Sequence, residues 1–379
     1  MTFIEKFGWL FQFQKFVSIP NYSESGNVTK VLLAIRRIIL VLALCQALHD
    51  IITILYVQNF RPIKLSKEIS IMFKLLTNIS FLANRCGFIF LILYSVLSNK
   101  YHLQLISTVL NFENRICCFI KINNHENILK RNFINIETVS VILYIVIFTS
   151  LYYVFGSVDH DIKSIISHSF FTIILTCDAL TILYCVNFLK RMTFFANILL
   201  NDNYDQRKYL LYMKLVFEYF KIIPLINSSL CGMIFVIIFK QIFMGCLTLY
   251  HNLLLFQYQH LALGEMYDIV FVFMWKFQYI IYIILLSLAG NKLTDKIQNL
   301  LRKQNSMNCI HYDKSRKFQN NCNKQQFLLW RFHIKTKIVV GSTEINNSGI
   351  FSMFSFIITC LIIILQFGQA EDDILTPGM

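Results

Sequence analysis

Polar side chains recur along the last long apolar run of the chain, residues 347–368. On a helical wheel at about 100° per residue, they fall within about 60° of one another. Hydrocarbon offers no partner to a hydroxyl or an amide, so this line of side chains must face protein or water. We call it the stripe. Its members are Ser348, Ser352, Ser355, Thr359 and Gln366.

The stripe has two interpretations. Small hydroxyl residues are typical of an interface between membrane helices, because they permit close approach and hydrogen bonds. A polar line is also typical of a wetted pore to which each subunit contributes one helix. In such a pore, adjacent apolar side chains form a constriction that closes by excluding water, with the glutamine as a polar ring beside it. The pore candidates are Ser352, Ser355, Thr359, Ile362, Ile363, Gln366 and Phe367.

The residues give little support to catalytic or metal chemistry. Cys309 and Cys322 flank His311, but at a spacing that fits no zinc pattern. Histidines and acidic residues do not cluster at a membrane boundary, as a metal-dependent membrane enzyme would require. We therefore expect no enzymatic activity, no catalytic residue, no metal and no cofactor.

The stripe belongs to a chain whose composition suits lipid. Of its 379 residues, 56% are hydrophobic and only 15% are charged, whereas a soluble domain is about 25% charged. The apolar residues gather in runs of the ~20 residues that a membrane helix needs. We predict an all-α fold with seven membrane helices. The predicted spans are 38–57, 69–97, 132–156, 164–189, 226–255, 266–290 and 347–368.

Lysine and arginine indicate the orientation of these spans. The segments 1–37, 98–131, 190–225 and 291–346 carry 27 of these residues, whereas the alternate loops and the tail carry 4. Positively charged loops stay on the cytoplasmic side, so the N-terminus is predicted to lie inside and the C-terminus outside. Because the net charge of +14 is spread over these loops, we expect no nucleic-acid partner.

The spans divide the chain into regions. Residues 1–37 interleave aromatic residues and lysines, which predicts an amphipathic helix on the inner membrane face. Residues 38–290 hold six membrane helices that bind the ligand, and the second, fourth, fifth and sixth are expected to continue into the cytoplasm. Residues 291–346 are predicted to form a cytoplasmic loop and an anchor helix. The pore helix, 347–368, and an extracellular tail, 369–379, follow.

The run TCLIIILQF resembles the seventh-segment motif of the insect gustatory receptor family, which is Thr-Tyr, five hydrophobic residues, then Gln-Phe. Thr359, Gln366 and Phe367 match this motif, and Cys360 stands where the family has tyrosine. The resemblance implies a ligand-gated, non-selective cation channel related to insect odorant receptors, in the plasma membrane of sensory neurons. In that family the seventh helices line the pore, and cytoplasmic extensions of helices 4 to 7 hold a tetramer together.

The resemblance also implies the partners of the protein. They are a small-molecule tastant, permeating cations, the lipid membrane and the other subunits of a homotetramer or of a heterotetramer with other gustatory receptors. The short length and the absence of a strongly polar set of pocket residues favour a bitter or other plant compound over a sugar.

In this family, tastants bind in the outer part of the membrane domain of each subunit. His168 and Thr172 share a helix face there, as do Trp275 and Gln278. An aromatic plane beside an amide suits a small polar or alkaloid-like ligand. The alternative is that His168 is an ordinary buried histidine and Trp275 an ordinary core or lipid-facing aromatic residue. The ligand candidates are Asn78, Arg85, Tyr152, His168, Thr172, Tyr267, Trp275 and Gln278.

Charged residues inside the spans are costly in hydrocarbon unless they are paired or hydrated. Arg85 and Asp178 lie in different predicted spans, and we expect them to form a structural ion pair.

Two other classes of seven-helix protein remain open as alternatives. A G-protein-coupled chemoreceptor needs its N-terminus outside, and the chain lacks an Asp-Arg-Tyr motif at the inner end of the third span. A transporter would have helices broken by glycine or proline at mid-membrane, whereas all four prolines lie at or outside the ends of the spans. These are Pro20, Pro62, Pro224 and Pro377.

Overall fold

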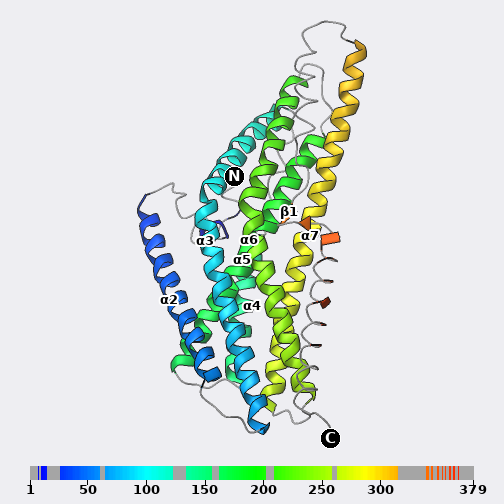
Figure 1. Ribbon diagram of the computed structural model, residues 1–379. Helices are drawn as coiled ribbons and strands as arrows, with labels where there is room; N and C mark the ends of the chain where they lie inside the picture. Colours follow the sequence, from blue (N-terminus) through cyan, green and yellow to red (C-terminus); the bar gives the residue numbers. More distant parts are fainter. Residues whose placement is uncertain are drawn as a thin grey trace.

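The chain forms a long bundle of helices in the computed structural model (Figure 1). The structure describes residues 7, 10–14, 26–59, 65–122, 134–155, 162–201, 209–257, 263–314, 339–340 and 343–344, and single residues between 348 and 366. The helices are α2 (Gly26–Asn59), α3 (Leu65–Ile122), α4 (Ile134–Phe155), α5 (Ile162–Asn201), α6 (Tyr209–Gln257) and α7 (Leu263–Lys314). In these residues the predicted helical fold is confirmed, with one short hairpin added.

Four of the helices are much longer than a bilayer requires. α3, α5, α6 and α7 have 58, 40, 49 and 52 residues, whereas about 20 residues cross a bilayer core. They run on together toward the top of Figure 1. Among the described residues, four stretches are long and apolar enough to cross a membrane. These are Leu82–Phe119, His168–Asn201, Leu211–Leu247 and Phe277–Gln304.

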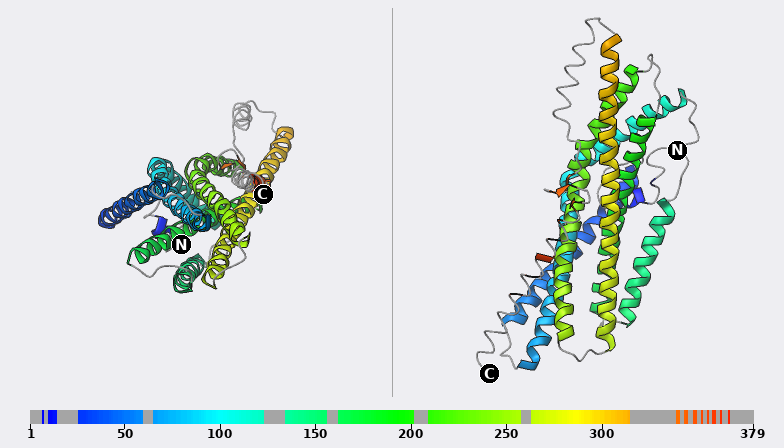
Figure 2. Two further views of the ribbon diagram at one scale, coloured as in Figure 1. Left: turned by 60° about the horizontal axis from the view of Figure 1, so that its bottom comes forward. Right: turned by 90° about the vertical axis from the view of Figure 1, so that its right-hand side faces the viewer.

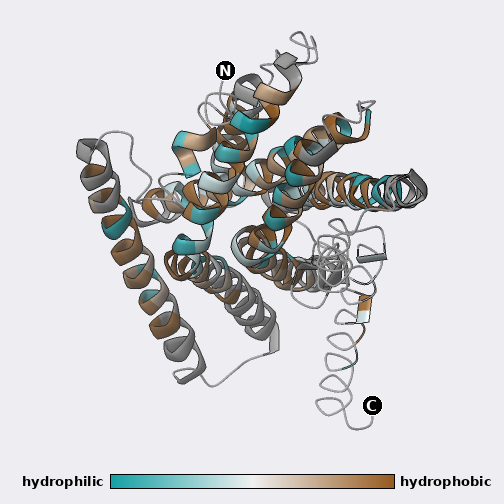
Figure 3. Ribbon diagram, turned by 90° about the horizontal axis from the view of Figure 1, so that it is seen from above, coloured by the Kyte–Doolittle hydropathy of each residue, from teal (hydrophilic) through white to brown (hydrophobic). Residues whose placement is uncertain are grey.

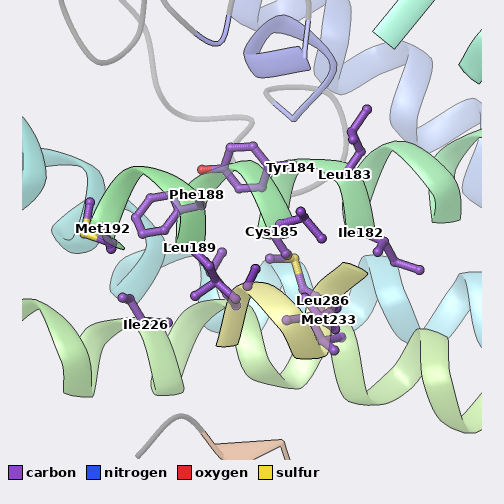
Figure 4. Close-up of a cluster of buried hydrophobic side chains, with 14 of the residues drawn as sticks. Ile182, Leu183, Tyr184, Cys185, Phe188, Leu189, Met192, Ile226, Met233 and Leu286 are labelled. Atoms are coloured by element: carbon purple, nitrogen blue, oxygen red, sulfur yellow. The ribbon is translucent and has the colours of Figure 1, made fainter. Parts of the chain in front are cut away.

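α5 is the central helix of the bundle. In its most apolar window 78% of the residues are buried, against 39% in α3 and in α7. α3 packs mainly against α6, α5 against α7, and α4 against α5. Figure 4 shows Leu189 of α5 on the side of the helix that faces Ile226 of α6, whereas Tyr184 lies on the opposite side of α5, and all three residues are buried. The apolar sequence of α5 therefore reflects contact with protein on most sides.

The pairing of α3 with α6 depends on a close approach at Gly232. The side chain of Tyr94 lies where a Cβ atom at Gly232 would stand, and the Tyr94 hydroxyl donates to the carbonyl of Ser228 at 3.1 Å. Small residues let membrane helices approach in this way. By contrast, a Cβ added at Gly245, also on α6, meets no atom within 4 Å.

Replacing Gly232 with alanine is expected to weaken this helix pair. The new methyl group overlaps the Tyr94 ring, and overpacking of this kind destabilises a core by about 1–3 kcal/mol. The midpoint of thermal unfolding of the detergent-solubilised protein measures the effect. Gly245→Ala is the matched control and is expected to be neutral or slightly stabilising, because alanine favours a helix over glycine. An equal loss in both variants would contradict the packing argument.

α2 lies at the edge of the bundle (Figure 2, left panel), where it packs against α3. Its ribbon carries apolar residues along its length (Figure 3), and several are exposed in the single chain, among them Val31, Ile38 and Ile52, as expected for a helix that faces lipid. One contact with α3 is polar and buried. Arg36 Nη2 donates to the carbonyl of Ile92 at 3.1 Å and to Ser95 Oγ at 2.8 Å. This side chain links the first half of α2 to α3.

The N-terminal segment corrects a prediction. Its described residues are helical, and Phe7, Leu10, Phe11 and Gln14 are at most 1% exposed. The Phe7 ring packs edge-on against Tyr184 of α5, with ring centroids 5.5 Å apart. Gln14 Nε2 lies 3.5 Å from a hydroxyl of α5. The apolar face predicted to lie on the membrane surface is instead buried inside the protein, because α5 offers it aromatic and hydroxyl partners.

Two local features of the fold were not predicted. β1 (Val339–Val340) and β2 (Thr343–Glu344) form an antiparallel hairpin, with Val340 opposite Thr343, and β1 packs against α6. Strands of two residues are too short to show an alternating pattern. Pro224 lies inside α6 and not at its end, in the stretch that precedes the predicted span. Proline removes one backbone hydrogen bond at that point.

Candidate channel and ligand sites

The described residues of the predicted seventh span are helical, and all of them except the buried Gly349 are exposed in the single chain. They include every member of the stripe and one of the two pore isoleucines, Ile362, which is 49% exposed. The stripe therefore does not pack against the subunit's own helices. Ile363 and Phe367 lie outside the described residues. The exposed residues are Ser348, Ser352, Ser355, Ile358, Thr359, Ile362 and Gln366.

Hydroxyl groups of the stripe are hydrogen-bonded within the helix. Ser352 Oγ donates to the carbonyl of Ser348 at 3.0 Å, and Thr359 Oγ1 donates to the carbonyl of Ser355 at 2.8 Å. Such bonds to the carbonyl four residues earlier satisfy the hydroxyl hydrogen inside an apolar segment. The hydroxyl oxygen atoms keep lone pairs that accept hydrogen bonds or coordinate a cation. At Ser352 and Thr359 the helix thus presents a polar oxygen while the hydroxyl hydrogen is paired.

Four ligand candidates have described side chains, on three helices. Arg85 of α3 is buried and donates to the backbone carbonyl of Gln46 of α2 at 3.3 Å. His168 and Thr172 on α5 and Gln278 on α7 are half-buried. The remaining four occupy helical positions whose side chains lie outside the description. These are Asn78 of α3, Tyr152 of α4, and Tyr267 and Trp275 of α7.

His168 lies at the contact between α4 and α5. Its ring centroid is 5.2 Å from that of Tyr153, and its ring hydrogen-bonds the backbone of Thr149. Thr172 Oγ1 donates to the carbonyl of His168 at 3.0 Å. The two residues therefore share a helix face, as the spacing predicts, and the histidine has a tyrosine from the neighbouring helix beside it.

Gln278 forms a short polar contact on α7. Its Nε2 donates to the hydroxyl of Tyr282 at 2.6 Å, one turn later on the same helix. The Tyr282 ring packs edge-on against Tyr279, with ring centroids 6.1 Å apart. The amide of Gln278 is therefore oriented by a tyrosine, and its carbonyl oxygen is a hydrogen-bond acceptor.

The expected pair of Arg85 with Asp178 is wrong. Asp178 of α5 instead forms a buried ion pair with Lys240 of α6. Gln241 Nε2 donates to the same oxygen, Asp178 Oδ2, at 3.2 Å, and the Tyr279 hydroxyl of α7 does so at 3.4 Å. We call Asp178, Lys240, Gln241 and Tyr279 the Asp178 cluster. The sequence shows two of these charges inside predicted spans, but not how the two helices align.

A second buried ion pair joins the longer helices further along the bundle. Arg191 of α5 contacts Glu113 of α3 at 2.7 Å, and its guanidinium lies 4.6 Å from the ring centroid of Phe195. The ring of Phe195 packs in turn on Phe112, with centroids 5.4 Å apart. These contacts show that α3 and α5 remain packed together beyond the predicted spans.

An open groove of about 410 Å³ lies between α3 and α6, where Arg115 pairs with Glu218. It contains none of the ligand candidates. Its lining residues are Asn114, Arg115, Cys118, Phe119, Leu211, Lys214, Leu215 and Glu218. Within the described ranges, no group of His, Cys, Asp and Glu side chains is placed to hold a metal ion.

Comparison with known proteins was made by sequence and by structure. No protein-family model matches the chain, and no curated protein matches its sequence. The fold is similar to that of the insect olfactory receptor OR5 from Machilis hrabei, with a TM-score of 0.59 and 11% identity. This match covers 95% of the present chain and 98% of the receptor.

The same receptor has also been solved in complex with eugenol. That structure matches with a TM-score of 0.52 and 11% identity, over 96% of the present chain and 98% of the receptor. The similarity extends over nearly all of both chains, so it concerns the whole architecture and not a single helix pair. Both structures are of a receptor, not of an enzyme. The chain therefore has the fold of insect olfactory receptor OR5.

Proposed function

We propose that the chain is a subunit of a ligand-gated, non-selective cation channel of the insect chemoreceptor family, and that it acts as a taste receptor. The stripe is the observation that carries this proposal. A polar line on a membrane helix, exposed in the single chain, needs a polar partner or water. Copies of the subunit arranged around an axis would supply both.

The fold supports a chemoreceptor over the other seven-helix classes. It is shared, along the full length of the chain, with an olfactory receptor. That receptor binds eugenol, a small aromatic molecule. A small apolar or amphipathic compound is therefore the ligand class that we propose here, bound among the candidates on α3, α4, α5 and α7.

Taste, and a bitter or other plant compound as the ligand, are the finer parts of the proposal. They are supported by the seventh-segment motif, in which Thr359, Gln366 and Phe367 match the gustatory receptor pattern. The cytoplasmic N-terminus, which the distribution of lysine and arginine supports, agrees with a channel and not with a G-protein-coupled receptor.

Whole-cell recording from cells that express the chain tests this proposal. We expect a panel of bitter plant compounds and small phenols, including eugenol, to evoke a cation conductance that persists when G proteins are blocked. A ligand-evoked calcium signal without any change in membrane conductance would contradict a channel. Staining of a tag at residue 1 in intact cells would contradict the proposed orientation.

A further inference from the structure

Three donors converge on one carboxylate oxygen in the Asp178 cluster. Lys240 Nζ, Gln241 Nε2 and the Tyr279 hydroxyl all contact Asp178 Oδ2. Among the described residues, neither Asp178 Oδ1 nor Gln241 Oε1 has a hydrogen-bond partner, although both atoms are buried. One oxygen of the carboxylate is therefore crowded while the other has no donor.

A fourth helix contacts the cluster at a glycine. The aliphatic part of the Lys240 side chain lies where a Cβ atom at Gly87 of α3 would stand. The cluster thus joins α5, α6 and α7 through polar contacts, and α3 through the Lys240 stem.

Stability alone is a poor reason for such a cluster. Desolvation of two charges offsets most of their attraction, so apolar residues of similar volume often serve as well or better. An incompletely satisfied buried network is less favourable still. The unequal use of the two carboxylate oxygens is, in contrast, well suited to a helix contact with two arrangements. A donor that leaves Asp178 Oδ2 still leaves two donors there, and Asp178 Oδ1 can accept a new hydrogen bond.

The position of the cluster relates it to the ligand candidates. On α5, His168 and Thr172 precede Asp178 by about three and two turns. On α7, Gln278 is adjacent to Tyr279, and the two side chains have different partners, Tyr282 and Asp178. A ligand that contacts α5 and α7 at the candidates therefore acts on the two helices just outward of the cluster.

We propose that the Asp178 cluster is a latch that holds α5, α6 and α7 together in the closed channel. The proposal rests on the proposed function and adds the coupling step to it. In the released arrangement, α7 is displaced from α5. A ligand that binds this arrangement more tightly than the latched one shifts the equilibrium toward it, by an amount set by the ratio of the two affinities. The Tyr279 hydroxyl makes the longest contact with Asp178 and is the first to leave.

Two changes test the latch without leaving a buried charge unpaired. Tyr279→Phe removes one contact and keeps the ring. The double change Asp178→Leu with Lys240→Met removes the ion pair, and with it the acceptor of Gln241 and Tyr279, and fills the volume with apolar side chains. Tyr219→Phe is the matched control, because the Tyr219 hydroxyl is buried and donates to the carbonyl of Met192 at 3.0 Å, away from the cluster.

Two measurements are made on each variant, at matched surface levels. The first is the current without ligand, together with the agonist concentration for half-maximal current. The second is the rate at which a small thiol reagent labels Cys177, which precedes Asp178 and is 2% exposed. We expect both test variants to raise the ligand-free current, lower the half-maximal concentration by about tenfold and label Cys177 faster. Tyr219→Phe is expected to behave as the wild type.

The outcomes separate the latch from the proposed function. Unchanged labelling of Cys177 in both variants overturns the latch. Faster labelling with a wild-type current and half-maximal concentration also overturns it, because the cluster then holds helices without controlling the channel. If the wild type carries no ligand-evoked current, the proposed function fails. In that case the labelling rate of Cys177 alone tests the latch. Faster labelling in the two variants than in the wild type supports a releasable contact between the helices, and equal rates overturn it.

Discussion

Lysine at position 366 is expected to lower the cation current by at least about tenfold, whereas glutamate at the same position is expected to maintain or increase it. A tenfold change corresponds to about 1.4 kcal/mol. A charge near a permeating ion contributes several kcal/mol at the effective dielectric constant of a protein surface, about 20. If four subunits place this residue around one pore, four introduced charges act on the same permeating cation. Their electrostatic energies add, so a tenfold change in current is a low estimate.

The argument for Gln366 begins with its exposure. It is helical and exposed in the single chain, on the same helix face as Ser352 and Thr359. A ring of positive charge in a pore repels cations and a ring of negative charge attracts them. Single-channel conductance measures this effect directly, because it does not depend on the number of channels at the surface.

The opposite charges serve as controls for each other. Both side chains are charged and of similar length, so both disturb a tightly packed helix interface. If the stripe is such an interface and no pore, lysine and glutamate are expected to reduce assembly and current together. Equal loss in both variants, with normal single-channel conductance in the channels that remain, would therefore contradict the pore and favour the interface.

The helical parts of the fold could be predicted from the sequence. The first six predicted spans lie almost entirely inside α2 to α7. A run of about 20 apolar residues that crosses a membrane forms a helix, because a helix satisfies its backbone hydrogen bonds within the run. The stripe also follows from the sequence, since the position of a side chain around a helix depends on spacing alone. Information of this kind is local, and a single sequence contains it.

Contacts between helices could not be predicted in the same way. Asp178 and Lys240 are 62 positions apart, and their pairing depends on how far α5 is shifted along α6. Arg85 was an equally plausible partner for Asp178 on charge alone. The hydrogen bonds of Gln241 and Tyr279 to the same oxygen depend on the same alignment. This is why the predicted ligand candidates did not include the Asp178 cluster.

The N-terminal segment shows a different limit of sequence analysis. Phe7, Leu10 and Phe11 follow helical spacing, which indicates one apolar face but not what covers it. Membrane lipid and a crevice between helices both accept aromatic residues. The contacts of Phe7 and Gln14 with α5 show that this face packs against the protein and not against lipid. Tyr184, which Phe7 contacts, also lies 3.1 Å from His102 Nε2 of α3 through its hydroxyl, so the segment covers a contact between α3 and α5.

Replacing Phe11 with alanine is expected to be among the most destabilising single changes in the chain. The Phe11 side chain is 0% exposed, and truncation of a buried phenylalanine to alanine costs about 3–5 kcal/mol. The midpoint of thermal unfolding and the amount of protein at the cell surface are both expected to fall. The adjacent Gln12 is exposed, so Gln12→Ala is the matched control and is expected to have little effect.

The same pair of variants separates the buried arrangement from the membrane-surface helix that the sequence predicts. On a membrane surface, Phe11 would lose only its contact with lipid, and the rest of the bundle would keep its thermal midpoint in detergent. A fall in the midpoint for Phe11→Ala but not for Gln12→Ala requires that the segment packs against the bundle. Equal midpoints in the two variants would contradict burial against α5 and return the segment to the membrane face, where aromatic residues and lysines also fit.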